Sequence, residues 1–260
     1  MTSRPYLAVT HYDGARFVGW QRQREGRTVQ AEIEAVLERL LGRRTPATGA
    51  GRTDTGVHAL GQGVGFQPGE RWSEDGAGLR RALNALLPRD IWVERVHAMR
   101  PGFHARKSAV ARQYRYVLGT DDAALSPFRR PYEWALGRPL DSGLLSDAAL
   151  LLLGEHDFRG LAARPGAADP DCRCRVALAQ WAPRADGTGV TFTIEANRFV
   201  HHMVRFLVGA MVDIARHRRP LSDLAALLVA SDNSAASPPA PPQGLYLVAV
   251  RYPQECYAET

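Results

Sequence analysis

Residues 51–62 read Gly51-Arg52-Thr53-Asp54-Thr55-Gly56-Val57-His58-Ala59-Leu60-Gly61-Gln62. We expect a loop over residues 49–63, because its glycines accept backbone angles that other residues avoid. An isolated Asp-Thr-Gly is most often a simple turn, in which the aspartate bonds its own backbone. Here Asp54 has Arg52 on one side and His58 on the other, and a carboxylate held between such groups is a candidate nucleophile.

The segments around this loop predict helices and strands in alternation. Thr28 can cap a helix that runs to about Leu41 with one apolar face, and a second helix covers residues 75–87 until Pro88 ends it. Strands are predicted at residues 7–12, 64–66 and 91–99. The first part of the chain therefore mixes both element types.

The second part of the chain has a similar mixture. We expect strands at residues 112–118, 176–181, 190–195 and 245–252, and helices at residues 144–153, 198–217 and 221–230. The helix over 198–217 is apolar around most of its circumference and should be buried. Residues 231–243 are rich in proline and predict an extended loop. Close strand pairs favour an α+β fold with mixed sheets over a doubly wound parallel sheet, and we place a domain boundary between residues 1–105 and 106–260.

Composition and charge indicate the class of binding partner and the cellular compartment. The net charge of +6 and the isoelectric point near 9.6 are typical of proteins that bind polyanions, although Lys107 is the only lysine and an arginine bias can also reflect a GC-rich genome. No apolar run reaches the ~20 residues of a membrane-spanning helix, and no signal peptide is evident. The three cysteines, Cys172, Cys174 and Cys256, form neither a disulfide framework nor a zinc motif. We expect a cytoplasmic protein without metal.

Several further segments resemble, in order along the chain, the tRNA pseudouridine synthase A family, whose active-site signature is usually Gly-Arg-Thr-Asp-Ala-Gly-Val-His. Together with residues 51–62 these segments span residues 13–250, which is nearly the whole chain. They are Asp13-Gly14 with Phe17-Val18-Gly19-Trp20-Gln21-Arg22-Gln23, Phe103-His104-Ala105-Arg106, Arg112-Gln113-Tyr114-Arg115-Tyr116, Gly154-Glu155-His156-Asp157-Phe158, Asn197-Arg198-Phe199-Val200-His201-His202-Met203-Val204-Arg205 and Gly244-Leu245-Tyr246-Leu247-Val248-Ala249-Val250.

The resemblance implies a pseudouridine synthase fold, with two α+β subdomains whose largely antiparallel sheets meet at a central cleft. It implies that Asp54 is the nucleophile for isomerising uridine and that the guanidinium of Arg205 is its partner. On the helix over 198–217, Arg205 lies in a polar stripe that could equally be a solvated face. Tyr114 matches the tyrosine that stacks on the target base, although a tyrosine in an alternating strand is more often part of the core.

The other residues implied by the family contact substrate. Arg52 resembles the arginine that enters the space left by the flipped nucleotide, which suits a planar cation. Leu245 occupies the position of an aliphatic residue under the base, and His202 is a structural or RNA-contacting histidine. Two departures stand out: Thr55 replaces the usual alanine, and Gln113 replaces a common arginine.

The family also implies the reaction's requirements and partners. An isomerisation needs no cofactor and no metal. The expected substrate is the anticodon stem-loop of tRNA, at positions 38–40, and the expected assembly is a homodimer. Two alternatives remain. A catalytically inactive tRNA-binding protein on the same fold would be expected to lack Asp54, Tyr114 or Arg205. An aspartic protease would need a symmetric dimer, since the chain has one Asp-Thr-Gly.

Overall fold

The computed structural model describes residues 4–72, 75–163 and 171–258. The chain divides into two compact units. We call Met1–Val110 with Leu247–Thr260 the N-terminal unit, and Ala111–Tyr246 the C-terminal unit. The last strand of the chain, expected in the second domain, therefore counts mainly with the first unit. As a division into functional domains, 1–105 and 106–260 stays a prediction.

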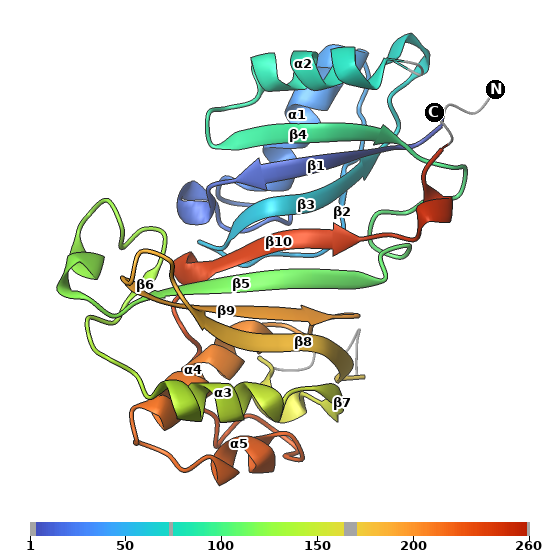
Figure 1. Ribbon diagram of the computed structural model, residues 1–260. Coiled ribbons are helices and arrows are strands. Elements are labelled where there is room, and N and C mark those ends of the chain that lie inside the picture. Colours follow the sequence, from blue (N-terminus) through green and yellow to red (C-terminus); the bar gives the residue numbers. More distant parts are fainter. Residues whose placement is uncertain (1–3, 73–74, 164–170, 259–260) are drawn as a thin grey trace. The chain divides into compact units, whose positions relative to one another are not determined.

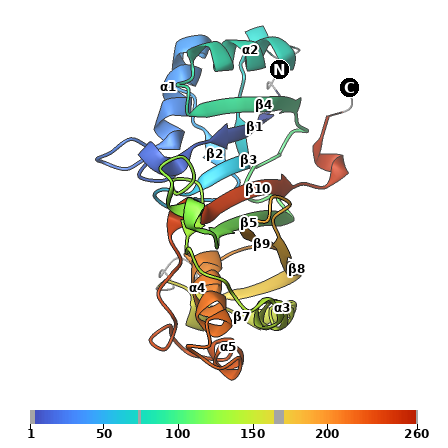
Figure 2. The ribbon, with the colours of Figure 1, turned by 60° about the vertical axis from the view of Figure 1, so that its left-hand side comes forward.

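The N-terminal unit is built on an antiparallel sheet. Its strands are β1 (Tyr6–Tyr12), β2 (Thr48–Gly49), β3 (His58–Phe66), β4 (Ile91–Ala98) and the last strand, β10 (Leu245–Arg251). The order is β4-β1-β3-β10, and β2 pairs with β3 (Figure 1). The helices α1 (Val29–Leu41) and α2 (Gly76–Leu86) pack against each other, and α2 packs against β4 (Figure 2).

Local sequence signals set the ends of these helices. The Thr28 side chain accepts a hydrogen bond from the Ala31 amide and so caps α1, as predicted. Gly42 ends α1 in the left-handed conformation, at φ 67°. Asp75 caps α2 in the same manner as Thr28, by accepting from the Gly78 amide. Both helices predicted in the first part of the chain are therefore confirmed, and each of their boundaries lies within one residue of the prediction.

Strand β3 corrects the loop expected over residues 49–63. It begins at His58 and runs through three glycines to Phe66. Glycine is depleted in strands, which concealed this one in the sequence. The structure supplies a packing reason at Gly61: a Cβ there would lie 2.1 Å from the carbonyl oxygen of Val248 in β10. The glycine is needed for close approach of the neighbouring strand.

The C-terminal unit also has an antiparallel sheet, in the order β5-β9-β8-β7. Its strands are β5 (Ala111–Gly119), β6 (Trp134–Ala135), β7 (Gly154–Asp157), β8 (Arg173–Pro183) and β9 (Gly189–Ala196), with β6 parallel to β5. Its helices are α3 (Ser142–Leu150), α4 (Met203–Ala215) and α5 (Ser222–Leu227). Helix α3 packs on both α4 and β8 (Figure 2). Short β7 was not expected from the sequence.

Helix α4 is the buried helix that its composition predicts. All of its residues are buried except Arg205 and Asp213. It begins at Met203, five residues after the predicted start, because His202 adopts the left-handed conformation at φ 62° and cannot continue a helix. The overall mixture of antiparallel sheets and helices confirms the α+β fold class. Among the described residues, no helix combines the length and the apolarity needed to cross a membrane.

Candidate active site

The loop that carries Asp54 is a tight turn with alternating exposure. The Val57 amide donates to the Asp54 carbonyl oxygen at 3.1 Å, and Gly56 supplies the positive φ of 78° that this turn requires. Thr53 and Val57 are buried, Asp54 is half-buried, and Arg52 is exposed. The turn therefore fixes the backbone on both sides of the carboxylate and leaves the Asp54 side chain partly open to solvent.

A buried polar cluster anchors this loop to the neighbouring strands. The hydroxyl groups of Tyr12 and Thr53 are 2.7 Å apart. The side-chain amide of Gln62 donates to the Gly51 carbonyl oxygen at 2.8 Å, while its oxygen lies 3.4 Å from the Gly51 amide. Burial raises the pKa of Tyr12 well above its usual value, so the hydroxyl stays protonated. The cluster ties the loop to β1 and β3.

A second segment, residues 13–20, supports the loop from its other side. The Trp20 amide donates to the Thr53 carbonyl oxygen at 3.0 Å, and the Gly14 amide donates to Nδ1 of His58 at 3.0 Å. A Cβ on Gly14 would lie 2.1 Å from the Val57 carbonyl oxygen, so only glycine allows this contact. Two segments that resemble the family at the sequence level thus pack directly on each other.

In the C-terminal unit, Tyr114 lies on β5 opposite Ile194 of β9. Its side chain is 8% exposed, and its ring meets the ring of Phe199 edge to face, with centroids 4.9 Å apart. This contact joins β5 to the segment that precedes α4. Tyr114 is therefore largely buried in its own unit and held by a neighbouring aromatic ring.

Arg205 is held by the proline-rich segment near residue 240. Its Nε donates to the Ala240 carbonyl oxygen at 2.7 Å, and the Ala240 amide donates back to the Arg205 carbonyl oxygen at 2.9 Å. One turn further along α4, a Cβ on Gly209 would lie 2.2 Å from the Pro238 carbonyl oxygen. The polar stripe predicted on this helix is thus covered in part by the proline-rich segment and is not simply a solvated face.

Leu245 and His202 occupy defined positions beside these groups. Leu245 is 5% exposed at the start of β10, directly after Gly244, where a Cβ would lie 2.7 Å from the Tyr116 ring. The imidazole ring of His202 lies 4.0 Å from that of His201, centroid to centroid. A non-glycine residue in the left-handed conformation costs about 1–2 kcal/mol, so the packing around His202 must maintain it.

The candidate residues thus fall into two groups. Asp54 and Arg52 belong to the N-terminal unit, and Tyr114, Arg205, Leu245 and His202 belong to the C-terminal unit. The partnership of Asp54 with Arg205 stays a prediction. Sequence reasoning passed over Tyr12 and Gln62 as supports of the Asp54 loop. The sequence signal was weak: Gln62 is the one polar residue between Ala59 and Phe66 of β3.

Comparison with known proteins identifies the family to which this fold and these residues belong. The sequence profile of the family described as tRNA pseudouridine synthase matches residues 8–106 and 148–253. These ranges include the Asp54 loop and the whole of both α4 and β10. The chain therefore belongs to the tRNA pseudouridine synthase family.

Individual relatives agree over almost the full length. The chain is 39% identical over 256 residues to the tRNA pseudouridine synthase A of Moorella thermoacetica, covering 95% of this chain and 100% of that protein. It is 38% identical over 253 residues to the protein of the same name from Myxococcus xanthus, covering 95% and 92% of the two chains. It is 39% identical over 250 residues to the tRNA pseudouridine synthase A of Escherichia coli O1:K1, covering 93% of this chain and 87% of that protein.

Proposed function

We propose that this chain isomerises uridine to pseudouridine in tRNA, with Asp54 as the nucleophile. The proposal combines family membership with the geometry of the Asp54 loop. A nucleophile needs a fixed position and access to substrate. Asp54 meets both needs, because hydrogen bonds and close glycine contacts hold the backbone around it while its side chain is half-buried.

The reaction balances without any added group. The bond between uracil N1 and ribose C1′ breaks, the base turns, and a bond forms between C5 and C1′. The proton on C5 leaves to solvent, and N1 takes up a proton. Asp54 adds to the ribose or the base, or promotes elimination from the sugar, and is released unchanged. No redox cofactor, metal or group donor is required by this scheme.

The remaining candidates supply charge and binding. Arg205 is proposed to stabilise the carboxylate of Asp54, since a guanidinium favours the charged form of a nearby acid. Tyr114 is proposed to stack on the target base and to assist removal of the C5 proton. Leu245 would lie under that base. Stacking contributes roughly 1–3 kcal/mol per base, which offsets part of the cost of unstacking it from the RNA.

Arg52 and His202 are proposed to contact the RNA around the target. Arg52 is exposed on the same loop as Asp54, as a residue that fills the space left by a flipped nucleotide must be. The target we propose is uridine at positions 38–40 of the anticodon stem-loop. We further propose that the protein works as a homodimer in the cytoplasm, without a bound metal.

Release of tritium from tRNA labelled at uridine C5 tests the function directly. Wild-type protein should release tritium to water without added cofactor. Asp54→Asn should abolish release and keep tRNA binding, because the amide cannot act as the nucleophile. Arg52→Ala should weaken productive binding more than the maximal rate. Asp147→Asn, at an exposed aspartate on α3, is the matched control and should behave as wild type.

Comparable turnover by wild type and Asp54→Asn would refute the assignment of the nucleophile. If wild type binds tRNA but releases no tritium, the protein is instead a tRNA-binding member of the family without activity. The aspartic protease considered at the sequence level is not favoured, because the family match extends over most of the chain.

A further inference from the structure

A surface loop of the C-terminal unit displays two aromatic rings. We call residues 126–132, which read Ser-Pro-Phe-Arg-Arg-Pro-Tyr, the aromatic loop. The side chain of Phe128 is 88% exposed and that of Tyr132 is 46% exposed. Single exposed apolar residues are common on protein surfaces and need no explanation by themselves. The aromatic loop differs because its conformation is fixed on several sides.

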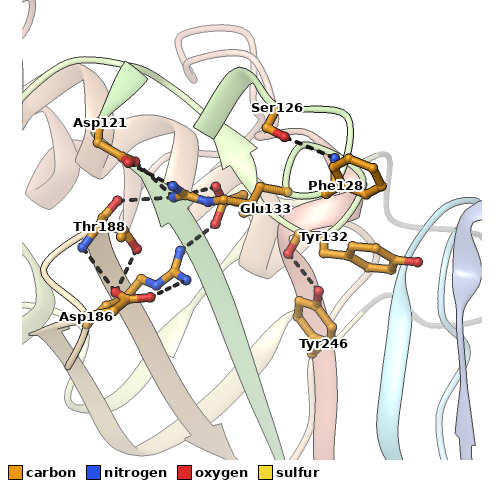
Figure 3. Close-up of polar contacts among 10 residues, drawn as sticks. Asp121, Ser126, Phe128, Tyr132, Glu133, Asp186, Thr188 and Tyr246 are labelled. Carbon is orange, nitrogen blue, oxygen red and sulfur yellow. Dashed lines mark hydrogen bonds and ion pairs between the residues drawn. The ribbon is translucent and has the colours of Figure 1, made fainter. Parts of the chain in front are cut away.

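An ion-pair network centred on one buried carboxylate, that of Glu133, anchors one side of the loop (Figure 3). Glu133, 3% exposed, lies between two guanidinium groups: that of Arg129 at 2.8 Å and that of Arg184, which donates a short hydrogen bond. Arg129 also binds both carboxylate oxygens of Asp121, at 2.8 and 2.9 Å, and this pairing lowers the pKa of Asp121. Arg184 continues the network to Asp186 at 3.0 Å.

Backbone contacts fix the rest of the loop. The Ser126 carbonyl oxygen accepts from the amides of Arg129 and Arg130, at 3.0 and 2.9 Å, and the Ser126 hydroxyl oxygen accepts from the Phe128 amide at 3.3 Å. The Tyr246 hydroxyl donates to the Tyr132 carbonyl oxygen at 2.6 Å. Pro127 and Pro131 further restrict the backbone, because the proline ring fixes φ. The backbone that carries each aromatic ring is therefore ordered before any ligand binds.

The surroundings of the rings are cationic. Arg130, two residues after Phe128, is exposed and makes no ion pair within the described part of the chain. The Arg115 guanidinium lies over the Tyr246 ring, 5.5 Å from its centroid. In Figure 3 the rings of Phe128 and Tyr132 point away from the acidic groups at Asp121 and Asp186. Aromatic rings beside uncompensated arginines favour single-stranded nucleic acid, in which bases stack and phosphates pair.

We propose that the aromatic loop binds an unpaired nucleotide of the RNA substrate, with Phe128 stacking on its base and Arg130 contacting the adjacent phosphate. This inference rests on the proposed function only in taking tRNA as the RNA. Because the loop backbone is already ordered, stacking on Phe128 costs little backbone conformational entropy. A surface that binds a second copy of the chain is expected to be apolar and to lack unpaired charges. The aromatic loop instead carries the exposed Arg130 beside its rings.

The test measures binding of two labelled RNAs by fluorescence anisotropy. One is an anticodon stem-loop hairpin with an unpaired loop, and the other is a fully paired duplex of the same stem sequence. All variants carry Asp54→Asn, so that turnover does not interfere. Phe128→Ala should raise the Kd for the hairpin roughly 5- to 100-fold and leave the Kd for the duplex within about twofold. Phe128→Trp should restore hairpin binding, because tryptophan also stacks.

The matched control is Val229→Ala, which removes an equally exposed apolar side chain, 86% exposed, just beyond α5 of the same unit. It should leave both affinities unchanged. An unchanged hairpin Kd in Phe128→Ala would overturn the proposal, and so would equal losses for hairpin and duplex. Dissociation of a wild-type dimer by Phe128→Ala, seen by light scattering, would show that the loop binds a second copy instead. Phe128-dependent hairpin binding, together with no tritium release by the protein that retains Asp54, would refute the proposed activity alone.

Discussion

Replacing Gln62 tests whether the buried cluster below the Asp54 loop positions the nucleophile. Gln62 is fully buried, and its amide group bonds both backbone groups of Gly51. Leucine has a similar size but can make neither bond. Two backbone groups then lose their partners, and each loss costs about 1–2 kcal/mol where water reaches poorly. We therefore expect Gln62→Leu to lower the free energy of unfolding by about 2–4 kcal/mol.

Activity should fall by more than the loss of folded protein explains. If Gly51 shifts, the backbone at Asp54 shifts with it, and a displacement near 1 Å can reduce turnover roughly 10- to 100-fold. The measurements are urea unfolding, followed by tryptophan fluorescence, and tritium release at a temperature where both proteins remain folded. The drop should appear mainly in kcat, with a smaller rise in KM, because Arg52 on the same loop shifts together with Asp54.

Gln30 offers a matched control in the same unit. Its side-chain amide donates to the Ala47 carbonyl oxygen at 3.0 Å and to Glu34, and its oxygen accepts from the Arg22 amide; these partners lie outside the Asp54 loop. Gln30→Leu should lose stability and keep kcat. Wild-type turnover by folded Gln62→Leu, or an equal loss of kcat in Gln30→Leu, would show that the cluster stabilises the fold without positioning Asp54.

Three further predictions concern stability and reactivity. The Arg27 guanidinium lowers the pKa of Asp90. The pair therefore stabilises the fold above the unfolded-state pKa of about 3.9, and this stabilisation is lost as pH falls through the folded-state pKa. Asp90→Asn should cost about 1–2 kcal/mol at neutral pH, and urea unfolding should show that the difference from wild type shrinks in acid. Glu133→Gln removes the buried carboxylate of the network, while Arg129 keeps Asp121 and Arg184 keeps Asp186; it should cost about 1–3 kcal/mol by the same assay, more than Glu155→Gln at an exposed site. Burial raises the pKa of the Cys174 thiol to about 12, so a thiol reagent near neutral pH should modify the less buried Cys256 first, and rapid labelling of Cys174 in folded protein would contradict this.

The sequence was sufficient for most elements because their signals are local. Thr28 and Asp75 are helix caps whose side chains act within three residues, and the apolar faces of α1 and α2 have clear helical periodicity. The strands β5 and β9 alternate in the manner of half-buried strands. The family and the fold class could both be predicted, since the matching segments are spread along the whole chain.

Other features depend on contacts that a single sequence does not reveal. The late start of α4 follows from the left-handed backbone of His202, a conformation unusual for histidine. Strand β3 is hidden by glycines that exist for close packing against β10. Likewise, Tyr12 and Gln62 reach the Asp54 loop from two different strands, so that neither has a distinctive local pattern.

The candidate site likewise has residues that the sequence predicted and contacts that it did not. Asp54, Arg52 and Tyr114 were identified by motif, and the structure adds what surrounds each of them. What could not be predicted is how a helix residue such as Arg205 is held. Its bond to Ala240 comes from a proline-rich segment that has no periodic signal of its own.

The path of the chain has a consequence for the order of folding during synthesis. The C-terminal unit is one uninterrupted stretch, but the N-terminal unit needs the final residues of the chain. Tyr252 donates to the Ala105 carbonyl oxygen, and Tyr257 packs with the small hydrophobic cluster around Leu7 and Met99. The N-terminal unit is therefore completed only after the C-terminal unit has been synthesised, and part of its core stays exposed to water until residues 247–258 have been made.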